Sequence, residues 1–233
     1  MEPPPIGPSA GLPHEERLFF GWLARLFGNG LALYVRLVAR SARISGPPVR
    51  QDQVVFAIWH ESNLVAAVAA YRLRPGHVHV SFSTRRFRGI VMNTMLQGLG
   101  WGAVTLPDPG EGSSAEATSV SRAMARVGAE GKSLVASCDG PVGPPRVAKP
   151  GALIVARESG LPVLPWAVAV RPPLRLNGRW DRQIVPVPFC RMRVDEGELL
   201  RVGPRERIRP VMARLQAELD RISLLADRRM GER

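Results

Sequence analysis

The stretch 54-VVFAIWHESNLV-65 decides the fold that we expect for this chain. Its apolar part, Val54–Ile58, is typical of a buried strand, and the alanine-rich residues that follow favour a helix over 63–72. His60 therefore lies where a strand gives way to a helix, which is where open α/β sheets gather their reactive groups. The alternative interpretation is a histidine that merely ends a strand.

The rest of the chain continues this alternation of strands and helices. Strands are predicted over 77–83, 103–106, 133–137, 162–170, 182–187 and 191–194, and helices over 87–99, 113–128, 152–158 and 205–228. The pattern predicts an α/β fold with a mainly parallel β-sheet and helices on both faces. We expect a flexible tail over 1–15, an α/β domain over 45–203, and an amphipathic C-terminal helix over 204–233 that packs on it.

The segment 17-RLFFGWLARLFGNGLALYVRLVARSAR-43 is the most apolar part of the sequence. Its uncharged run from Leu26 to Val35 is far shorter than the ~20 residues that cross a bilayer. The Gly28-Asn29-Gly30 triplet predicts a break, and so an amphipathic helical hairpin over 16–44. Aromatic residues on one side and arginines on the other suit a membrane interface. The alternative is packing on the domain, and both hold if the two surfaces are shared.

Composition narrows the class of partner. The 233 residues include 32 Lys and Arg against 20 Asp and Glu, a net charge of +12, which favours an anionic membrane, phosphorylated substrate or nucleic acid. No nucleic-acid motif is present and the arginines are scattered, so we do not expect a nucleic-acid partner. The two cysteines have no metal-ligand spacing, which favours a reduced, intracellular protein without a metal. The proline-rich first residues do not resemble a signal peptide.

Three segments are expected to meet at one edge of the sheet. His60, the segment Ser83–Arg88 and Asp139 each follow a predicted strand. The carboxyl ends of parallel strands lie on the same edge, so these segments bring a base, a basic cluster and a carboxylate together.

Four segments of the chain resemble the lysophospholipid acyltransferase superfamily, and most closely a small bacterial branch of uncharacterised proteins. They are FAIWH (56–60), STRRFRG (83–89), the long segment 112–170, and WDRQIVPVPF (180–189). The DGPxGPxxxxKPG pattern from Asp139 to Gly151 is the most specific of the matching motifs.

The resemblance implies acyl transfer from a thioester of CoA or acyl carrier protein to a lipid hydroxyl, with no other cofactor. His60 would be the general base, a role suited to a side chain whose ordinary pKa is about 6.5. The basic stretch that begins at Ser83 would hold the acceptor phosphate. The basic residues of this stretch are Arg85, Arg86 and Arg88. Asp139 and Gly140 would lie near the histidine. Arg146 and Lys149 would face the same anionic ligand as the arginines. The protein would be cytoplasmic and peripheral on the inner face of the cell membrane.

The sequence departs from the superfamily at three positions. The superfamily has an aspartate five residues after the histidine, where this chain has Val65, so another carboxylate must orient the imidazole. Glu61 and Asp139 are the candidates. Arg88 replaces an acidic residue of the closest branch, and Cys138 replaces a proline.

Other interpretations of these residues stay open from sequence alone. The alternative for the arginines of 85–88 is a solvated surface cluster. Ser113 and Ser114 are more typical of a helix N-cap than of catalytic nucleophiles. Cys138 is a remote candidate nucleophile. At the level of the whole protein, the alternatives to acyl transfer are a non-catalytic lipid-binding or scaffold protein and a hydrolase of acyl thioesters or lipids.

Overall fold

The computed structural model describes residues 14–47, 53–73, 79–83, 87–105, 123–124, 126–128, 130, 132–140 and 143–231. Seven of the described strands form one sheet, in the order β1 (Arg43–Ser45), β9 (Arg191–Glu196), β6 (Val163–Arg171), β2 (Val55–Ile58), β5 (Ser133–Ser137), β3 (His79–Ser83) and β4 (Gly102–Thr105). Neighbouring strands are parallel except for the antiparallel pair β6–β9. The expected α/β fold with a mainly parallel sheet is confirmed.

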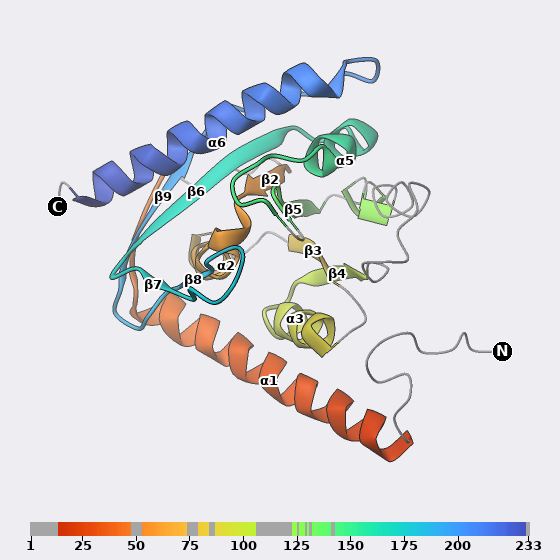
Figure 1. Ribbon diagram of the computed structural model, residues 1–233, viewed down its shortest axis with the longest axis vertical. Coiled ribbons are helices and arrows are strands. Elements are labelled where there is room, and N and C mark those ends of the chain that lie inside the picture. Colours follow the sequence, from red (N-terminus) through yellow and green to blue (C-terminus); the bar gives the residue numbers. More distant parts are fainter. Residues whose placement is uncertain are drawn as a thin grey trace.

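Helices cover both faces of this sheet (Figure 1). On one face lie α1 (His14–Ser41), α2 (Asn63–Leu73) and α3 (Phe87–Gly98), and on the other α5 (Gly151–Ser159) and α6 (Ile208–Gly231). The surroundings of strand β2 explain its apolar sequence. Phe56 and Ile58 pack toward α2 on one face, and Val55 and Ala57 pack toward α5 and α6 on the other. A strand that is buried on both faces has a continuous apolar run in its sequence.

The expected N-terminal hairpin is wrong, because residues 14–41 form the single helix α1. Gly28 lies inside the helix, where it allows close packing. A β-carbon at Gly28 would lie 2.5 Å from Cβ of Thr94 and 2.6 Å from the carbonyl oxygen of Val91, both in α3. A β-carbon at Gly98 would likewise lie 2.8 Å from Cβ of Ala32. The glycines let the axes of α1 and α3 approach, whereas the sequence pattern alone indicates a break.

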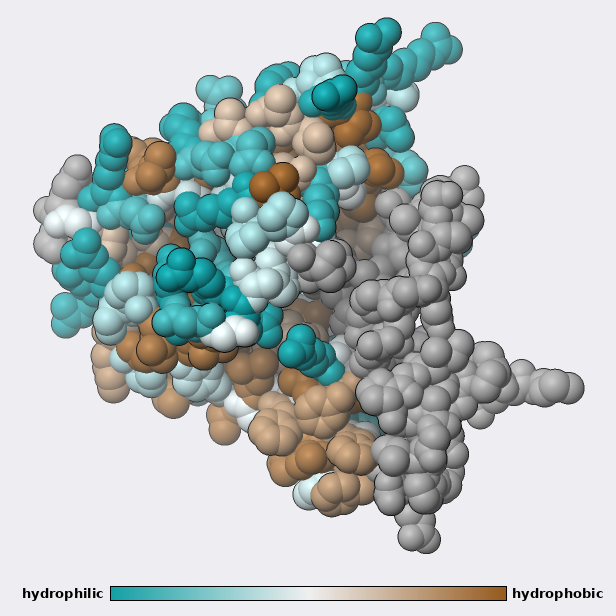
Figure 2. Space-filling model, in the orientation of Figure 1, coloured by the Kyte–Doolittle hydropathy of each residue, from teal (hydrophilic) through white to brown (hydrophobic). Residues whose placement is uncertain are grey.

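Helix α1 packs one face on the domain and exposes the other. Its buried residues are small or β-branched: Ala24, Ala32, Val35, Val38 and Ala39. Its exposed face carries large apolar residues, which are Phe19, Phe20, Trp22, Leu26, Phe27, Leu33 and Leu37. In Figure 2 they form a hydrophobic band along the helix. No helix in the described ranges is long and apolar enough to cross a membrane.

Most of the remaining elements follow the predictions closely, although strands β1 and β7 (Leu174–Arg175) were not predicted. Strand β5 has the predicted bounds, and the C-terminal helix buries Val211, Leu215, Leu219 and Ile222 against the sheet. The strand expected over 182–187 is only β8 (Ile184–Val185), which pairs with β7 in a separate two-stranded ribbon. Of the helix expected over 113–128, only 123–124 and 126–128 are described, and these are helical. Of the tail expected over 1–15, residues 1–13 lie outside the described residues, and residues 14–15 belong to α1.

Candidate active site

His60 begins a short 3₁₀ turn, His60–Ser62, between the end of β2 and the start of α2. Strand β2 lies between β5 and β6, at the centre of the parallel part of the sheet. The side chain of His60 is 20% exposed, so its ring is held by protein and still reachable from solvent. The position at the carboxyl edge matches the sequence expectation.

A buried carboxylate from a distant loop holds the His60 imidazole. Nδ1 of His60 lies 2.7 Å from Oδ2 of Asp181, which follows β7 in the loop to β8. The guanidinium of Arg179 grips the same carboxylate with two hydrogen bonds, from Nε to Oδ1 and from Nη2 to Oδ2, each of 2.8 Å. A carboxylate only accepts hydrogen bonds, so Nδ1 carries the proton and Nε2 is left to accept one. This is the tautomer that a general base needs.

The charge of Asp181 is secured by its partners. Burial opposes ionisation, but the hydrogen bonds from Arg179 and His60 and the positive charge of Arg179 outweigh it and lower the pKa of Asp181 below its ordinary value. The carboxylate is therefore ionised at neutral pH. It can orient the imidazole and stabilise the imidazolium that forms when Nε2 takes a proton.

Asp139 lies beside His60, as expected, but it binds backbone instead of the imidazole. Its Oδ1 accepts the backbone N–H of His60 at 2.7 Å, and its Oδ2 accepts the backbone N–H of Arg146 at 2.8 Å. The side chain is buried. Asp139 thus fixes the turn that carries His60 and ties it to the proline-rich loop. The expectation that Asp139 orients the imidazole is wrong, because Asp181 binds Nδ1 of His60 instead.

Glu61, the other expected partner of the imidazole, points to two arginines. Its Oε1 accepts from Nε of Arg146 at 2.9 Å, and its Oε2 accepts from Nη1 of Arg175 at 2.8 Å. The backbone carbonyl of Glu61 accepts from Nε2 of Gln183 at 2.8 Å. Glu61 therefore joins the His60 turn to the proline-rich loop and to the β7–β8 ribbon. Arg146 was expected to face an anionic ligand, and in the structure its guanidinium binds the carboxylate of Glu61.

Two glycines of the DGPxGP motif make room for aromatic rings. A β-carbon on Gly140 would lie 2.9 Å from Cδ2 of His60, and one on Gly143 would lie 2.7 Å from Cε3 of Trp180. Gly143 also has a φ of +75°, which side chains rarely adopt. The centroids of the His60 and Trp180 rings are 5.0 Å apart. The motif glycines thus let the loop press against both rings and fix the position of the imidazole.

Cys138 has the character of a core residue. It is buried, and burial followed by the charge of Asp139 raises the pKa of its thiol to about 12. The thiolate, which is the nucleophilic form, is therefore scarce at neutral pH. This disfavours the alternative in which Cys138 attacks a substrate.

The expected anion-binding residues are placed only in part. Ser83 ends β3, Arg88 is exposed at the start of α3, and Arg85 and Arg86 lie outside the described residues. Lys149 is half-buried, and its backbone N–H donates to the carbonyl of Cys138 at 2.8 Å. Across the described part of the chain, no group of three His, Cys, Asp or Glu side chains is arranged to hold a metal ion. Ser113 and Ser114 also fall outside that part.

Sequence reasoning missed Asp181 and Arg179. The two residues lie in an irregular loop, where no periodic pattern assigns a partner, and Asp181 is 121 positions from His60. A signal was nevertheless present. Asp181 is the only acidic residue between Glu158 and Asp195, and it stands in the segment 180–189 that resembles the superfamily.

The site defines the chain as an α/β protein with a histidine–carboxylate pair at the carboxyl edge of a mainly parallel sheet. Its fold is similar to that of the 1-acyl-sn-glycerophosphate (LPA) acyltransferase PlsC from Thermotoga maritima. The TM-score is 0.53 and the sequence identity 13%, over 90% of this chain and 82% of that chain. No protein-family model matches the chain, and no curated protein matches it significantly. At this identity the likeness shows a shared fold.

Proposed function

We propose that this protein is an acyltransferase of the lysophospholipid acyltransferase type, which moves a fatty acyl group from a thioester to the hydroxyl of an anionic lipid acceptor. The observation that carries the proposal is the His60–Asp181 hydrogen bond at the edge of a PlsC-like sheet. The pair supplies the orienting carboxylate that Val65 does not. Val65 is fully buried in the core, so the side chain at position 65 does not face the imidazole of His60.

The proposed reaction uses His60 twice. Nε2 of His60 takes the proton of the acceptor hydroxyl as its oxygen attacks the thioester carbonyl. The carbon–sulfur bond then breaks, and the leaving thiolate takes the proton back from the imidazolium. The products are an ester and a free thiol, the thiol of CoA or of acyl carrier protein. Asp181 stays ionised throughout and stabilises the imidazolium. The arginines proposed for the acceptor phosphate are Arg85, Arg86 and Arg88.

The proposal includes attachment of α1 to a membrane surface. The exposed apolar face of α1 is flanked by the exposed arginines Arg25 and Arg40. Amphipathic helices of this composition lie in the interface of anionic membranes. Attachment would bring the lipid acceptor to the His60 edge.

The experiment follows thiol release and acylated lipid in parallel, with acyl-CoA as donor and lysophosphatidate as acceptor. We expect His60→Ala and Asp181→Asn to lower both signals by about 10² or more, because general-base catalysis supplies factors of that size. Cys138→Ala is the control and should keep near wild-type activity, since its thiol is protonated. The melting temperature of each variant shows that the fold survives.

Each remaining alternative predicts a different outcome. Thiol release without acylated lipid would point to a hydrolase, in which water replaces the acceptor. Binding of lipid or thioester without turnover would point to a non-catalytic protein with a degraded site. Turnover that is equal in the wild type and in His60→Ala would exclude His60 as the base.

A further inference from the structure

Gln216 of α6 binds two backbone groups of the proline-rich loop that lies beside the His60 turn. Its Oε1 accepts the N–H of Ala148 at 2.7 Å, and its Nε2 donates to the carbonyl of Arg146 at 3.0 Å. The same Nε2 donates to Oδ2 of Asp220, one turn further along α6, at 2.8 Å. These partners determine the orientation of the amide, because only its nitrogen can donate a hydrogen bond. Gln216 therefore fixes a short piece of the loop to a long, packed helix.

The composition of the loop makes it dependent on such bonds. Proline has no backbone N–H, and the segment 143–150 contains three prolines. The N–H groups of Arg146 and Ala148 both donate to side chains, the first to Asp139 and the second to Gln216. Arg146 has a φ of 54°, in the left-handed region that residues with a side chain rarely adopt. A backbone of this kind persists where surrounding contacts impose it, and here the two side chains impose it.

Arg146 is linked to the His60 turn by two routes. Its backbone N–H binds one oxygen of the Asp139 carboxylate, whose other oxygen accepts the N–H of His60. Its guanidinium binds the carboxylate of Glu61, the residue that follows His60. Asp139 is buried, so a lost N–H partner would leave part of a buried carboxylate without a hydrogen bond. A displacement of Arg146 would therefore disturb both links to the turn that carries the candidate base.

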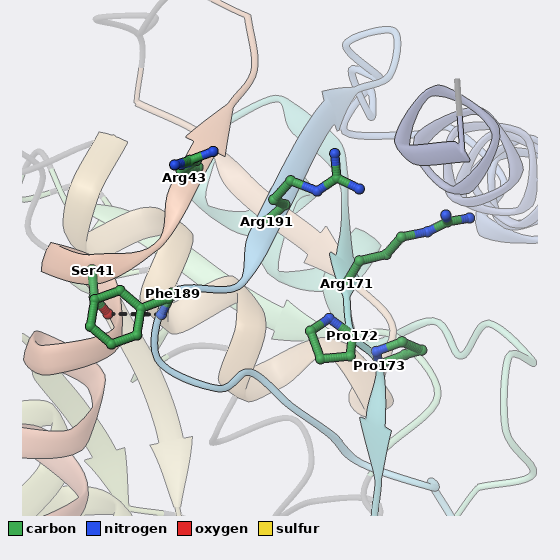
Figure 3. Close-up of a pocket in the computed structure, with 7 residues that line it drawn as sticks. All are labelled: Ser41, Arg43, Arg171, Pro172, Pro173, Phe189 and Arg191. Carbon is green, nitrogen blue, oxygen red and sulfur yellow. Dashed lines mark hydrogen bonds between the residues drawn. The ribbon is translucent and has the colours of Figure 1, made fainter. Parts of the chain in front are cut away.

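The space around these residues suits a structural link better than a binding site. The cavity lined by Arg146 and Glu61 has a volume of about 40 Å³, which admits water. Pockets for organic ligands have volumes of about 300 Å³ or more. An open cavity of about 830 Å³ lies at the end of α1 and is lined by Arg43, Arg171 and Phe189 among others, but by neither Arg146 nor Glu61 (Figure 3). The contacts of Arg146 and Glu61 therefore serve the arrangement of the chain itself.

We infer that Gln216 is a positioning residue for His60, which acts from α6 through Arg146 and Asp139. The inference rests on the proposed role of His60 as general base. A general base must lie within hydrogen-bond reach of the proton that it takes, so a small displacement of its turn slows the reaction. Such a displacement affects the chemical step more than substrate binding, and kcat should fall while KM changes little. The N–H of His60 should also become less protected from exchange with solvent.

The test compares Gln216→Met with two control variants of α6 in the full-length protein. Gln216→Met keeps the length of the side chain and removes the amide. We expect the His60 N–H to exchange about tenfold faster, kcat with acyl-CoA and lysophosphatidate to fall about tenfold, and KM to stay within about twofold. Arg221→Met removes a polar side chain that binds Glu218 within the same helix, and Ile222→Val removes a buried methylene and lowers the melting temperature. Both controls should keep the wild-type kcat and the wild-type exchange at His60.

A double-mutant cycle tests the route through Asp139. In an Asp139→Asn background the link between the loop and His60 is already disturbed, so Gln216→Met should lower kcat by less than about threefold. A full tenfold loss in that background would show that Gln216 does not act through Asp139.

Hydrogen exchange separates this inference from the proposed function. A wild type without turnover, together with faster His60 exchange in Gln216→Met alone, would overturn acyl transfer and support Gln216 as the residue that positions the turn. Unchanged exchange at His60 in Gln216→Met would overturn the inference, and so would an equal increase in Ile222→Val, which would show a general loss of stability. If Gln216→Met does not fold, Gln216→Asn decides by the same measurement, because its shorter amide cannot reach both backbone groups.

Discussion

Asp181 is a buried carboxylate that serves two partners, the imidazole of His60 and the guanidinium of Arg179. Burial of a charge is unfavourable unless hydrogen bonds compensate it, so the carboxylate depends on both partners. Trp180 and Asp181 are adjacent in the chain and touch the same imidazole, one through its ring and one through its carboxylate. A short loop between β7 and β8 therefore sets both the position and the tautomer of the candidate base.

The lowered pKa of Asp181 makes a prediction for acid unfolding. A carboxylate that ionises more easily in the folded state stabilises the protein fully above its unfolded pKa of about 3.9, and this stabilisation is lost as the pH falls through the lower folded value. We expect the difference in unfolding free energy between the wild type and Asp181→Asn to shrink as the pH falls below about 4. Urea unfolding at a series of pH values measures it.

Arg179→Gln provides the companion variant. It removes a group that lowers the pKa of Asp181, so the acid limb of stability should move to higher pH. An acid limb that stays in place in Arg179→Gln would show that Arg179 does not hold the Asp181 carboxylate in its ionised form.

The sequence predicts some site contacts and not others, for physical reasons. The proximity of His60 and Asp139 follows from two buried apolar strands that end in polar residues, since parallel strands present their ends together. The hydrogen bond of Asp181 depends on the path of an irregular loop, which no periodicity encodes. The bonds that Asp139 makes to backbone N–H groups are equally hidden, because a pattern shows which segments meet and not which atoms pair.

Helix α1 shows the same distinction among elements. The apolar and amphipathic patterns place the buried strands β2, β5 and β6 and the helix α6 within a few residues, because burial on one or two faces imposes a period. The glycines of α1 are misleading in the sequence, because a glycine favours a turn locally and also allows close contact between helices. Only the presence of Thr94 and Val91 opposite Gly28 decides between the two.

Gly28 and Gly30 test that explanation as a matched pair within one helix. Gly30 is exposed and a β-carbon there would meet nothing within 4 Å. We expect Gly30→Ala to stabilise the protein by about 0.5–1 kcal/mol, since alanine is the better helix former. Gly28→Ala should destabilise it by about 1–3 kcal/mol, because the new methyl group overlaps α3.

Urea unfolding of both variants with an unchanged m value would measure the difference. Two stabilising substitutions would contradict the close packing of α1 on α3, and two destabilising ones would indicate that the helix is broken near residue 29.

At the scale of the whole molecule, the sheet relates the His60 edge to the exposed face of α1. Helix α1 packs on the face of the sheet that also carries α2, which follows the His60 turn directly. The net charge of +12 adds long-range attraction to an anionic surface. Apolar contact with a membrane would then come from α1 and long-range attraction from the net charge, so the two can be separated by mutation.

Leu37 and Leu224 provide that separation, because they are equally exposed on helices on opposite faces of the sheet. Leu37 of α1 is 54% exposed and Leu224 of α6 is 55% exposed. If α1 lies in the membrane interface, Leu37→Gln should weaken binding to phosphatidylcholine vesicles several-fold, and Leu33→Gln/Leu37→Gln by about tenfold or more, roughly 1.4 kcal/mol. Leu224→Gln should bind like the wild type, since α6 faces away from the bilayer. Flotation of the full-length protein with vesicles measures all four proteins, and an equal loss in Leu37→Gln and Leu224→Gln would show that α1 is not the membrane-facing helix.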